Sequence, residues 1–488
     1  MSRDTVLLIA IALVRLLVHL LTNGHYGFHR DELATLDDAR YLAWGYVAYP
    51  PLTPFLARVA LELSGVPVVG LRFFGALAQC AAMVFTGLMA REMGGRRWAQ
   101  VAAALAVAIA PVSILWGALF QYSGFDCLWW VLAAYCAARL LRTEDARWWL
   151  GIGAAIGLGM MTRYTMGFLA LGITGGVLLT PARRDLRSKW LWMGVAASVL
   201  IFLPNLVWQA QHDLISLDFL CFLHARDVRI GRADGFLLQQ LFVPANPFTV
   251  PLWAAGLWFY FAKPTGKRYR LLGWMFVIPF VLFVIAQGRE YYTAGSYPLL
   301  CAGGAVGGEQ WIAARRWLAA SALVLGAAFG ALLVPIGSVN SWWWNHVASR
   351  VDDFREEVGW PELVETIAGI RDTLPAKERP ELGLLAGNYG EAGAINLYGP
   401  EHGLPKAISG VNSYWLRGYG DPPPQTLIVV GLSHAALDRY FESCEVAGHV
   451  SNRYGVKNQE TREHPDIFLC RGLRQPWPEF WKRFRRYG

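Results

Sequence analysis

The stretch Thr5–Leu21 reads TVLLIAIALVRLLVHLL and decides the class of protein to which this chain belongs. A helix that crosses a bilayer needs about 20 mostly apolar residues, and this stretch with its flanks supplies them. A cleaved signal peptide is the competing interpretation, but Arg15 and His19 interrupt the apolar run and no clean small-residue cleavage site follows. We therefore predict a retained transmembrane helix here.

Similar apolar runs continue along most of the chain, each approaching the length that a bilayer requires. After the first run they cover residues 68–90, 98–118, 125–141, 148–162, 165–180, 190–208, 247–262, 271–287, 295–312 and 317–337. They predict about eleven membrane-spanning helices. The fold class that follows is a polytopic α-helical membrane protein.

The composition agrees with this class. Of the 488 residues, 55% are hydrophobic and only 16% are charged, against roughly 25% charged in an ordinary soluble protein. These proportions exclude a disordered chain, a fibrous chain and most soluble enzymes, because so many apolar residues must face something other than one protein core. We expect the lipid bilayer to be that partner.

The basic residues lie in loops that fall on one side of the predicted membrane. A net charge of +8 could suggest a nucleic-acid partner, but Lys and Arg are enriched in the cytoplasmic loops of membrane proteins. With a cytoplasmic N-terminus, alternation through eleven spans puts every basic cluster inside. We therefore predict a multi-pass protein of the bacterial inner membrane and no nucleic-acid partner. The clusters are Arg91–Arg97, Arg139–Arg147, Arg183–Lys189, Lys263–Arg270 and Arg315–Arg316.

Three segments are then exterior: the loop 23–67, residues 209–246 and the chain from residue 338. We divide the chain into a membrane domain, residues 1–337, and a soluble periplasmic domain, residues 338–488. Short apolar runs alternate there with helical patterns and predict a small α/β domain. The expected strands are Leu382–Leu385, Thr426–Val430 and Ile467–Cys470, and the expected helices are Glu362–Leu374, Glu391–Leu397 and Ala435–Glu442.

Two cysteines, Cys444 and Cys470, lie in this exterior domain. An oxidising compartment permits a disulfide between them. Their pairing is a hypothesis at this point.

The first exterior loop carries two adjacent carboxylates, Asp31 and Glu32, directly after Arg30. Leu33 and Leu36 begin an apolar pattern at helical spacing, which predicts an amphipathic helix on the membrane surface. At the N-terminus of this helix and beside a guanidinium, Asp31 is favoured as the ionised carboxylate. It therefore suits a general base that deprotonates a hydroxyl. The alternative is that both carboxylates only cap a helix.

The order of these features resembles the family 39 glycosyltransferases of the GT-C fold, which include protein O-mannosyltransferases and lipid A aminoarabinose transferases. In the family, as in this chain, an acidic pair after the first span is followed by a Pro-Pro-Leu turn, which is Pro50-Pro51-Leu52 here. Later segments are also similar: Ser123-Gly124-Phe125-Asp126, Leu158–Thr165, Pro204–Gln209, and Gly288–Tyr292 followed by Tyr297-Pro298. The resemblance covers about residues 1–335.

One position departs from this pattern. Many aminoarabinose-type members carry an acidic and a basic residue directly before Pro-Pro, where this chain has Ala48 and Tyr49. The departure argues against an aminoarabinose assignment.

The resemblance implies an enzyme that transfers a hexose or pentose from a polyprenyl phosphate carrier to an acceptor hydroxyl on the exterior face. The hydroxyl attacks the anomeric carbon and configuration inverts. Asp31 is then the general base, and Glu32 orients Asp31 or holds sugar hydroxyls. No cofactor is expected, because the lipid-linked sugar donor is a substrate. Metal dependence occurs in other GT-C families and is not predicted here.

The departing phosphate needs cationic donors, and guanidinium groups suit that role. Arg289 is the first candidate because it lies at the exterior edge of a predicted span, and Arg163 is the second for the same reason. For both residues the alternative is an interfacial arginine that contacts any lipid headgroup.

Four more residues complete the predicted donor site. Tyr291 and Tyr292 follow Arg289 and could line the sugar pocket, although tyrosine is common at membrane interfaces without any ligand. Asp126 is a carboxylate near the exterior end of a predicted span. Because placing a carboxylate in or at the edge of a membrane costs free energy, Asp126 is a candidate for a functional role or for pairing with an arginine. Tyr49, directly before the Pro-Pro turn, is the fourth candidate for binding the donor.

Two other classes of function compete with the enzyme: a transporter or flippase for a lipid-linked sugar, and a non-catalytic scaffold of the cell envelope. Transporters usually contain inverted repeats and helices broken near the midplane. Here the charged groups gather at one face, which favours catalysis there. The sequence leaves open the sugar, the oligomeric state, and whether the acceptor is a protein, a lipid or a glycan.

Overall fold

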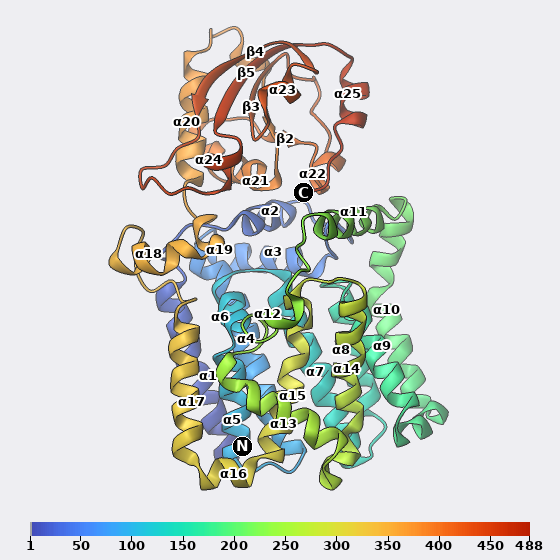
Figure 1. Cartoon of the computed structure of the whole chain (residues 1–488). Helices are drawn as coiled ribbons and strands as arrows, with labels where there is room; N and C mark the ends of the chain where they lie inside the picture. The colour runs from blue at the N-terminus through green and yellow to red at the C-terminus, as the bar shows by residue number, and fades with distance from the viewer. Residues whose placement is uncertain (1) are drawn as a thin grey trace.

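The computed structural model describes residues 2–488. Figure 1 shows a bundle of helices, an α/β layer stacked on one end of it, and helices lying crosswise between the two. The bundle consists of α1 (Arg3–Thr22), α4 (Val68–Glu92), α5 (Arg97–Ala108), α6 (Pro111–Ala118), α7 (Tyr122–Thr143), α8 (Trp148–Met160), α9 (Met166–Leu178), α10 (Lys189–Gln211), α13 (Val250–Phe261), α14 (Arg270–Ile285), α15 (Tyr297–Gly307) and α17 (Arg316–Ala331).

Every predicted apolar run coincides with a bundle helix or with the bent pair α5–α6. Five helices are long and apolar enough to cross a membrane: α1, α4, α7, α10, and α14 with its preceding turn. The number rises to seven if α5–α6 and α9 with the turn after it each count as one span. The 62° bend between α5 and α6 lies just before Pro111, which has no amide hydrogen to continue a helix. The many-helix membrane architecture is thus confirmed, and the count of about eleven stays a prediction.

The basic loops meet at the end of the bundle opposite the α/β layer (Figure 1). Ion pairs join these loops to one another and to the N-terminal segment: Arg97–Asp4, Arg142–Glu92, Arg268–Glu144 and Arg184–Glu144. The pairs of Asp4 and Glu144 lie at the surface and contribute little stability, whereas Glu92 is buried. They do show that the loops share one end, as the alternation of spans predicted.

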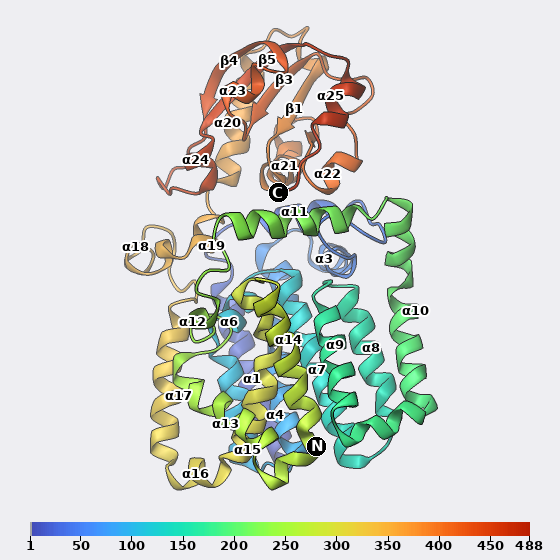
Figure 2. The ribbon, with the colours of Figure 1, turned by 45° about the vertical axis from the view of Figure 1, so that its right-hand side comes forward.

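Three helices lie across the other end of the bundle: α2 (Arg30–Asp38), α3 (Leu52–Ser64) and α11 (Ile215–Arg229). Figure 2 shows α11 running across the bundle beneath the α/β layer. The helix predicted after Arg30 is present, and its apolar face packs against protein; its place at the membrane surface stays a prediction. Leu33 and Leu36 are buried in a core shared with α21 (Tyr389–Tyr398) of the C-terminal domain. At Gly393 a side-chain carbon would lie 2.7 Å from the Leu33 carbonyl carbon, so the glycine permits this close packing.

The C-terminal domain is built on a five-stranded sheet of order β2-β1-β3-β5-β4. Its strands are β1 (Leu382–Ala386), β2 (Ala407–Ser409), β3 (Thr426–Val430), β4 (Phe441–His449) and β5 (Asp466–Leu473). β1 pairs parallel to β2 and β3, whereas β5 pairs antiparallel to β3 and β4. Residues on one face of β1 and β3 pack toward α20 (Trp360–Thr373) and α21, and those on the other toward α25 (Trp477–Arg483). These central strands are therefore apolar on both faces.

Three strands of this domain were predicted correctly, whereas β2 and β4 were missed. The helix expected over Ala435–Glu442 is wrong beyond Leu437, where α23 (His434–Leu437) ends and β4 soon begins. β4 is an edge strand with mostly exposed polar side chains, so no apolar pattern marked it. The predicted disulfide is present and links Cys444 of β4 to Cys470 of β5.

Shorter helices complete the chain: α12 (Phe236–Gln239), α16 (Glu309–Ala314), α18 (Trp342–His346), α19 (Asp352–Arg355), α22 (Ser413–Leu416) and α24 (Gln459–Glu463).

Candidate active site

Asp31 lies in the first turn of α2, between the bundle and the C-terminal domain. His29 caps this turn: its ring accepts a hydrogen bond from the Asp31 amide at 3.2 Å, and its own amide donates to Glu32 at 2.8 Å. Gln121 Nε2 donates to Asp31 Oδ2 at 3.1 Å, and Tyr389 Oη donates to Asp31 Oδ1 at 2.9 Å. The Asp31 side chain is still 36% exposed, so the carboxylate remains accessible to an incoming hydroxyl.

Glu32 is completely buried and has a different role. Its Oε1 accepts hydrogen bonds from Arg72 Nε at 2.9 Å and from the Phe120 amide at 2.8 Å. Its Oε2 lies 2.7 Å from Arg72 Nη2 and also accepts the His29 amide. With both oxygens committed, Glu32 has no free face for the sugar hydroxyls that we expected it to hold. It instead ties α2 to α4, and so helps to position Asp31.

Arg163 lies between α8 and α9, inside a cage of tyrosine rings. Its guanidinium carbon is 5.2 Å from the centre of the Tyr122 ring, 5.4 Å from Tyr291 and 4.4 Å from Tyr292. Within residues 2–488, no carboxylate oxygen lies within 4.0 Å of this guanidinium. Cation–π contacts hold such a group in place without neutralising its charge. Arg163 is therefore available to an anionic ligand.

Arg289 borders the same cage but already has a carboxylate partner. Its Nε lies 2.6 Å from Oδ2 of Asp227 on α11, and its Nη1 donates to Tyr291 Oη at 3.1 Å. Burial alone would raise the pKa of Asp227, but the hydrogen bond and charge of Arg289 outweigh it and lower that pKa. The pair is thus ionised, so Arg289 already has an anionic partner, whereas Arg163 has none within the described residues.

Tyr122 connects the cage to Asp31. It is the first residue of α7, follows Gln121, and lies within electrostatic range of both Asp31 and Arg163. The Tyr49 ring lies 5.6 Å from that of Tyr122. The general base and the cationic cage predicted from separate motifs therefore belong to one region.

Two other predicted residues lie deeper in this region. Tyr49 is buried, and its hydroxyl donates to Asp38 Oδ2 at 2.5 Å. Asp126 is also buried, and Thr165 Oγ1 donates to its Oδ2 at 3.4 Å. In the described part of the chain, the Oδ1 atom of Asp126 has no hydrogen-bond partner. Tyr49 therefore packs against Tyr122 of the cage. Asp126 has one carboxylate oxygen that accepts no hydrogen bond within the described residues.

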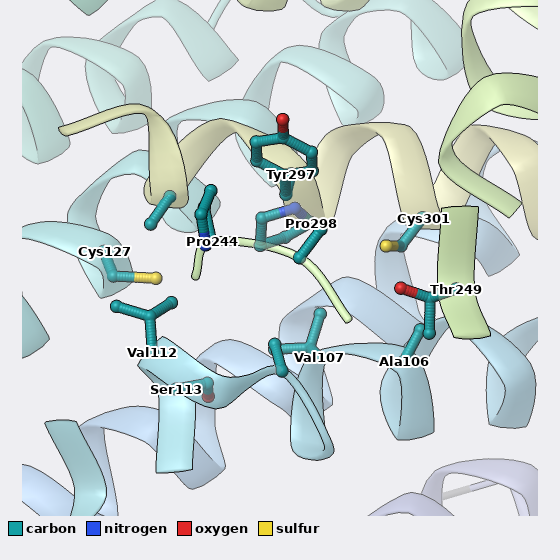
Figure 3. Close-up of a pocket in the computed structure, with 13 residues that line it drawn as sticks. Ala106, Val107, Val112, Ser113, Cys127, Pro244, Thr249, Tyr297, Pro298 and Cys301 are labelled. Atoms are coloured by element: carbon teal, nitrogen blue, oxygen red, sulfur yellow. The ribbon is translucent and has the colours of Figure 1, made fainter. Parts of the chain in front are cut away.

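A small cavity lies within the bundle, among α5, α6, α7 and α15 (Figure 3). Its space is about 20 Å³ and its walls are mostly apolar, including Val112, Cys127 and Pro298. A sugar needs more room and several polar partners. The cavity is therefore not the sugar site.

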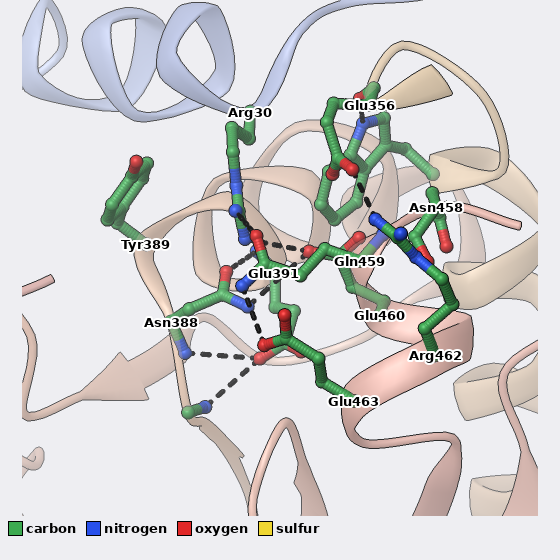
Figure 4. A network of polar contacts seen from close by, with 12 residues as sticks. Arg30, Glu356, Asn388, Tyr389, Glu391, Asn458, Gln459, Glu460, Arg462 and Glu463 are labelled. Atoms are coloured by element: carbon green, nitrogen blue, oxygen red, sulfur yellow. Dashed lines mark hydrogen bonds and ion pairs between the residues drawn. The ribbon is translucent and has the colours of Figure 1, made fainter. Parts of the chain in front are cut away.

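The C-terminal domain is fixed to α2 by the polar network drawn in Figure 4. Arg30 extends from α2 to Gln459 and Glu460 of α24, with its Nη2 at 2.9 Å from Glu460 Oε1. Its guanidinium also lies over the Tyr389 ring at 5.5 Å. Because Arg30 adjoins Asp31 in the chain, the contacts that dock the domain also hold the candidate base.

Sequence reasoning missed two residues that bond to Asp31. Gln121 stands two residues before the Ser123 motif, so a closer inspection of that motif's flank could have found it. Tyr389 is 358 residues away in sequence from its partner, and no local pattern connects them. Over residues 2–488, the structure contains no cluster of three or more His, Cys, Asp or Glu side chains placed to hold a metal ion.

The chain can now be compared with known proteins. Residues 48–208 match the family model described as dolichyl-phosphate-mannose-protein mannosyltransferase. Over 269 residues the chain is 25% identical to the lipid A galacturonosyltransferase RgtD of Rhizobium johnstonii, which covers 52% of this chain and 54% of the relative. The chain thus spans about half the length of this curated relative.

Solved structures show the same architecture over nearly the whole chain. ArnT from Cupriavidus metallidurans, solved with undecaprenyl phosphate, has a TM-score of 0.58 at 16% identity and covers 95% of this chain and 97% of its own. The apo oligosaccharyltransferase of Archaeoglobus fulgidus has a TM-score of 0.50 at 11% identity and covers 79% of this chain and 63% of its own. These comparisons agree with the resemblance predicted from the motifs: the chain is similar in sequence to membrane glycosyltransferases and shares the fold of the solved GT-C structures.

Proposed function

We propose that this protein transfers a sugar from a polyprenyl phosphate to an acceptor hydroxyl, with Asp31 as the general base. One observation carries the proposal: an accessible carboxylate, held by Gln121 and Tyr389, lies beside a cage that holds the unpaired Arg163. A base and a cation so placed suit a reaction in which the acceptor hydroxyl loses a proton and the sugar donor loses a phosphate.

The reaction follows from these positions. The acceptor oxygen attacks the anomeric carbon and forms the new glycosidic bond, while its proton passes to Asp31. The bond between the anomeric carbon and the phosphate oxygen breaks on the opposite face, so configuration inverts. Arg163 stabilises the departing phosphate by charge-assisted hydrogen bonds, and Arg289 assists from its pair with Asp227. Tyr291 and Tyr292 border the space where the sugar is transferred.

The comparisons support the donor class. The structural relative ArnT is solved with undecaprenyl phosphate, and the matching family is described by a dolichyl-phosphate-linked mannose. We extend a polyprenyl-phosphate sugar donor to this chain on that basis. The proposed setting is the bacterial inner membrane, with the N-terminus in the cytoplasm and the C-terminal domain in the periplasm.

The test uses the purified full-length protein in proteoliposomes with radiolabelled polyprenyl-phosphate sugars and an extract of envelope lipids and glycans as acceptor. The donors offered separately are mannose, galactose, galacturonic acid and arabinose. Asp31→Asn keeps the size of the side chain but removes the base. We expect its transfer rate to fall by about a hundredfold or more, with binding of the donor retained.

Glu62→Gln is the matched control, because Glu62 is a 64% exposed carboxylate on α3. It should transfer at the wild-type rate. Unchanged transfer by Asp31→Asn would show that the proposed base is wrong. Passage of the labelled donor across the bilayer without any transfer by the wild-type protein would instead identify a flippase.

A further inference from the structure

A second pocket lies between the C-terminal end of α2 and the segment of the C-terminal domain that runs from α21 to β2. It contains about 200 Å³ of space. We call it the interdomain pocket; Asp37, Arg40 and Tyr41 line it from the α2 side, and Asn396, Leu404 and Lys406 from the C-terminal domain. Asp37 follows Asp31 by six residues, which is about 9 Å along a helix. The pocket is thus near the candidate base.

The two cations of this pocket lack acidic partners. Arg40 Nη1 donates to the Asn396 carbonyl at 2.8 Å, and Lys406 Nζ donates to Tyr41 Oη at 2.5 Å. Neither cation lies within 4.0 Å of a carboxylate oxygen anywhere in residues 2–488. A guanidinium has five N–H donors and an ammonium has three. Most donors of both groups therefore remain free at the pocket.

The acid in the pocket cannot neutralise these cations, because its own partners occupy it. Asp37 Oδ2 lies 2.5 Å from Arg417 Nη1 and accepts a hydrogen bond from Asn396 Nδ2 at 3.1 Å. Arg417 also pairs with Asp38. The local balance is therefore three cations against two acids, and the surplus positive charge belongs to Arg40 and Lys406.

The remaining walls suit a sugar ring. Tyr41 is 39% exposed, and its ring lies 5.0 Å from Lys406 Nζ. Leu404 adds an apolar surface, and Asn396 adds an amide. Sites of this kind combine apolar and aromatic contact area with a few polar groups that fix orientation.

We propose that the interdomain pocket binds a negatively charged sugar, one that carries a phosphate or a carboxylate group, as part of the acceptor. The assignment of this sugar to the acceptor rests on the proposed function, whereas its binding to the pocket does not require catalysis. The donor phosphate is provided for elsewhere, by the arginines at the tyrosine cage. A charged group held next to α2 would present the rest of the acceptor to Asp31.

The experiment is a calorimetric titration of the full-length protein in nanodiscs with four probes: galactose 6-phosphate, galacturonate, galactose and inorganic phosphate. We expect at least one charged sugar to bind at least tenfold more tightly than galactose or inorganic phosphate. The double variant Arg40→Gln/Lys406→Gln should weaken that binding at least tenfold, since each lost charge-assisted bond has a comparable effect.

The control is Arg439→Gln/Lys457→Gln, which removes one exposed arginine and one exposed lysine from elsewhere on the same domain. It should bind as the wild type does. Binding of no probe, equal binding of galactose or inorganic phosphate, or unchanged binding by the double pocket variant would each overturn the proposal. Asp31→Asn should bind the charged sugar normally, so a failure of the proposed base and a failure of this pocket give different results.

Discussion

At the residue scale, Asp31 differs from its acidic neighbours in its accessibility. Glu32, Asp37 and Asp38 are buried and paired with arginines. Asp31 is partly exposed and receives two neutral hydrogen bonds instead of pairing with an arginine. A carboxylate used as a base must accept a proton during the reaction, and a tight arginine partner would oppose that step. The neutral donors orient Asp31 without this penalty.

The first prediction concerns Tyr389→Phe, which removes the hydroxyl that donates to Asp31 and keeps the ring that packs beneath Arg30. We expect kcat for transfer to fall about fivefold, because one hydrogen bond of roughly 1 kcal/mol that orients the base is lost. The KM for the donor should stay unchanged, since the arginine cage is untouched. Steady-state kinetics in proteoliposomes measure both.

Tyr440→Phe is the control, a tyrosine in the same domain that packs against Phe480 on the far side of the sheet. It should keep the wild-type kcat. An equal loss of activity in both variants would mean that the effect is a general weakening of the domain and that Tyr389 does not position the base.

At the element scale, α2 is held from two directions. Glu32 ties it to α4 of the bundle through Arg72, and Arg30 ties it to α24 of the C-terminal domain through Glu460. Leu33 lies in the apolar core between these two attachments. A short helix of this kind has little stability alone, so its position depends on its tertiary contacts.

The second prediction is that Arg30→Met loosens this attachment. Methionine preserves much of the apolar stem, but it leaves the nearly fully buried Glu460 carboxylate without its partner. Leaving one member of a buried pair unpaired costs about 3 kcal/mol or more. We expect faster amide hydrogen exchange in α24 and α21, measured by mass spectrometry.

Arg58→Met provides the comparison, because Arg58 and Glu62 form an exposed pair on α3. Its effect should stay below about 1 kcal/mol. If exchange in α24 were the same in Arg30→Met as in Arg58→Met, the Arg30 contact would not hold the domain.

At the scale of the whole molecule, the C-terminal domain forms part of the candidate active-site region. It supplies Tyr389 to Asp31 and one wall of the interdomain pocket, and its core continues into α2. Buried carboxyl groups cluster where it meets the rest of the chain. Burial, and then the charge of Glu460, raise the pKa of Glu391 to about 8.

The third prediction follows from the sign of this shift. The folded state holds the Glu391 proton more tightly than the unfolded chain, whose carboxyl ionises near 4.5. The stability that this group contributes is therefore greatest below about pH 4.5 and is lost as the pH rises through about 8. We expect the unfolding temperature of the protein to fall between pH 6 and 9, and Glu391→Gln to reduce that slope.

Glutamine mimics the neutral carboxyl and can still accept the amides of Gly387 and Asn388. Some slope should remain, because burial also raises the pKa of Glu357 to about 8. Glu401→Gln, at an exposed position, should leave the slope as it is in the wild type. A slope in Glu391→Gln equal to that of the wild type would contradict the prediction.

Particular residues show how far sequence reasoning extends. Asp31 and Arg163 could be predicted because each lies in a short motif at the end of an apolar run. Glu32 was given a chemical role because its neighbour in sequence has one, and only the position of Arg72 shows that its carboxylate is occupied. Arg289 was ranked above Arg163 without knowledge of its partner, because Asp227 lies on a separate helix and no local pattern connects the two.

The sequence by itself determined the membrane class, the positions of the apolar helices, the grouping of the basic loops and the GT-C resemblance. These features depend on local composition and periodicity, which are properties of residues that are neighbours in the sequence. Only the tertiary structure decided which carboxylate stays open, which arginine stays unpaired, and that Tyr389 bonds to Asp31. Burial and charge pairing depend on residues tens to hundreds of positions apart, so no local pattern could specify them.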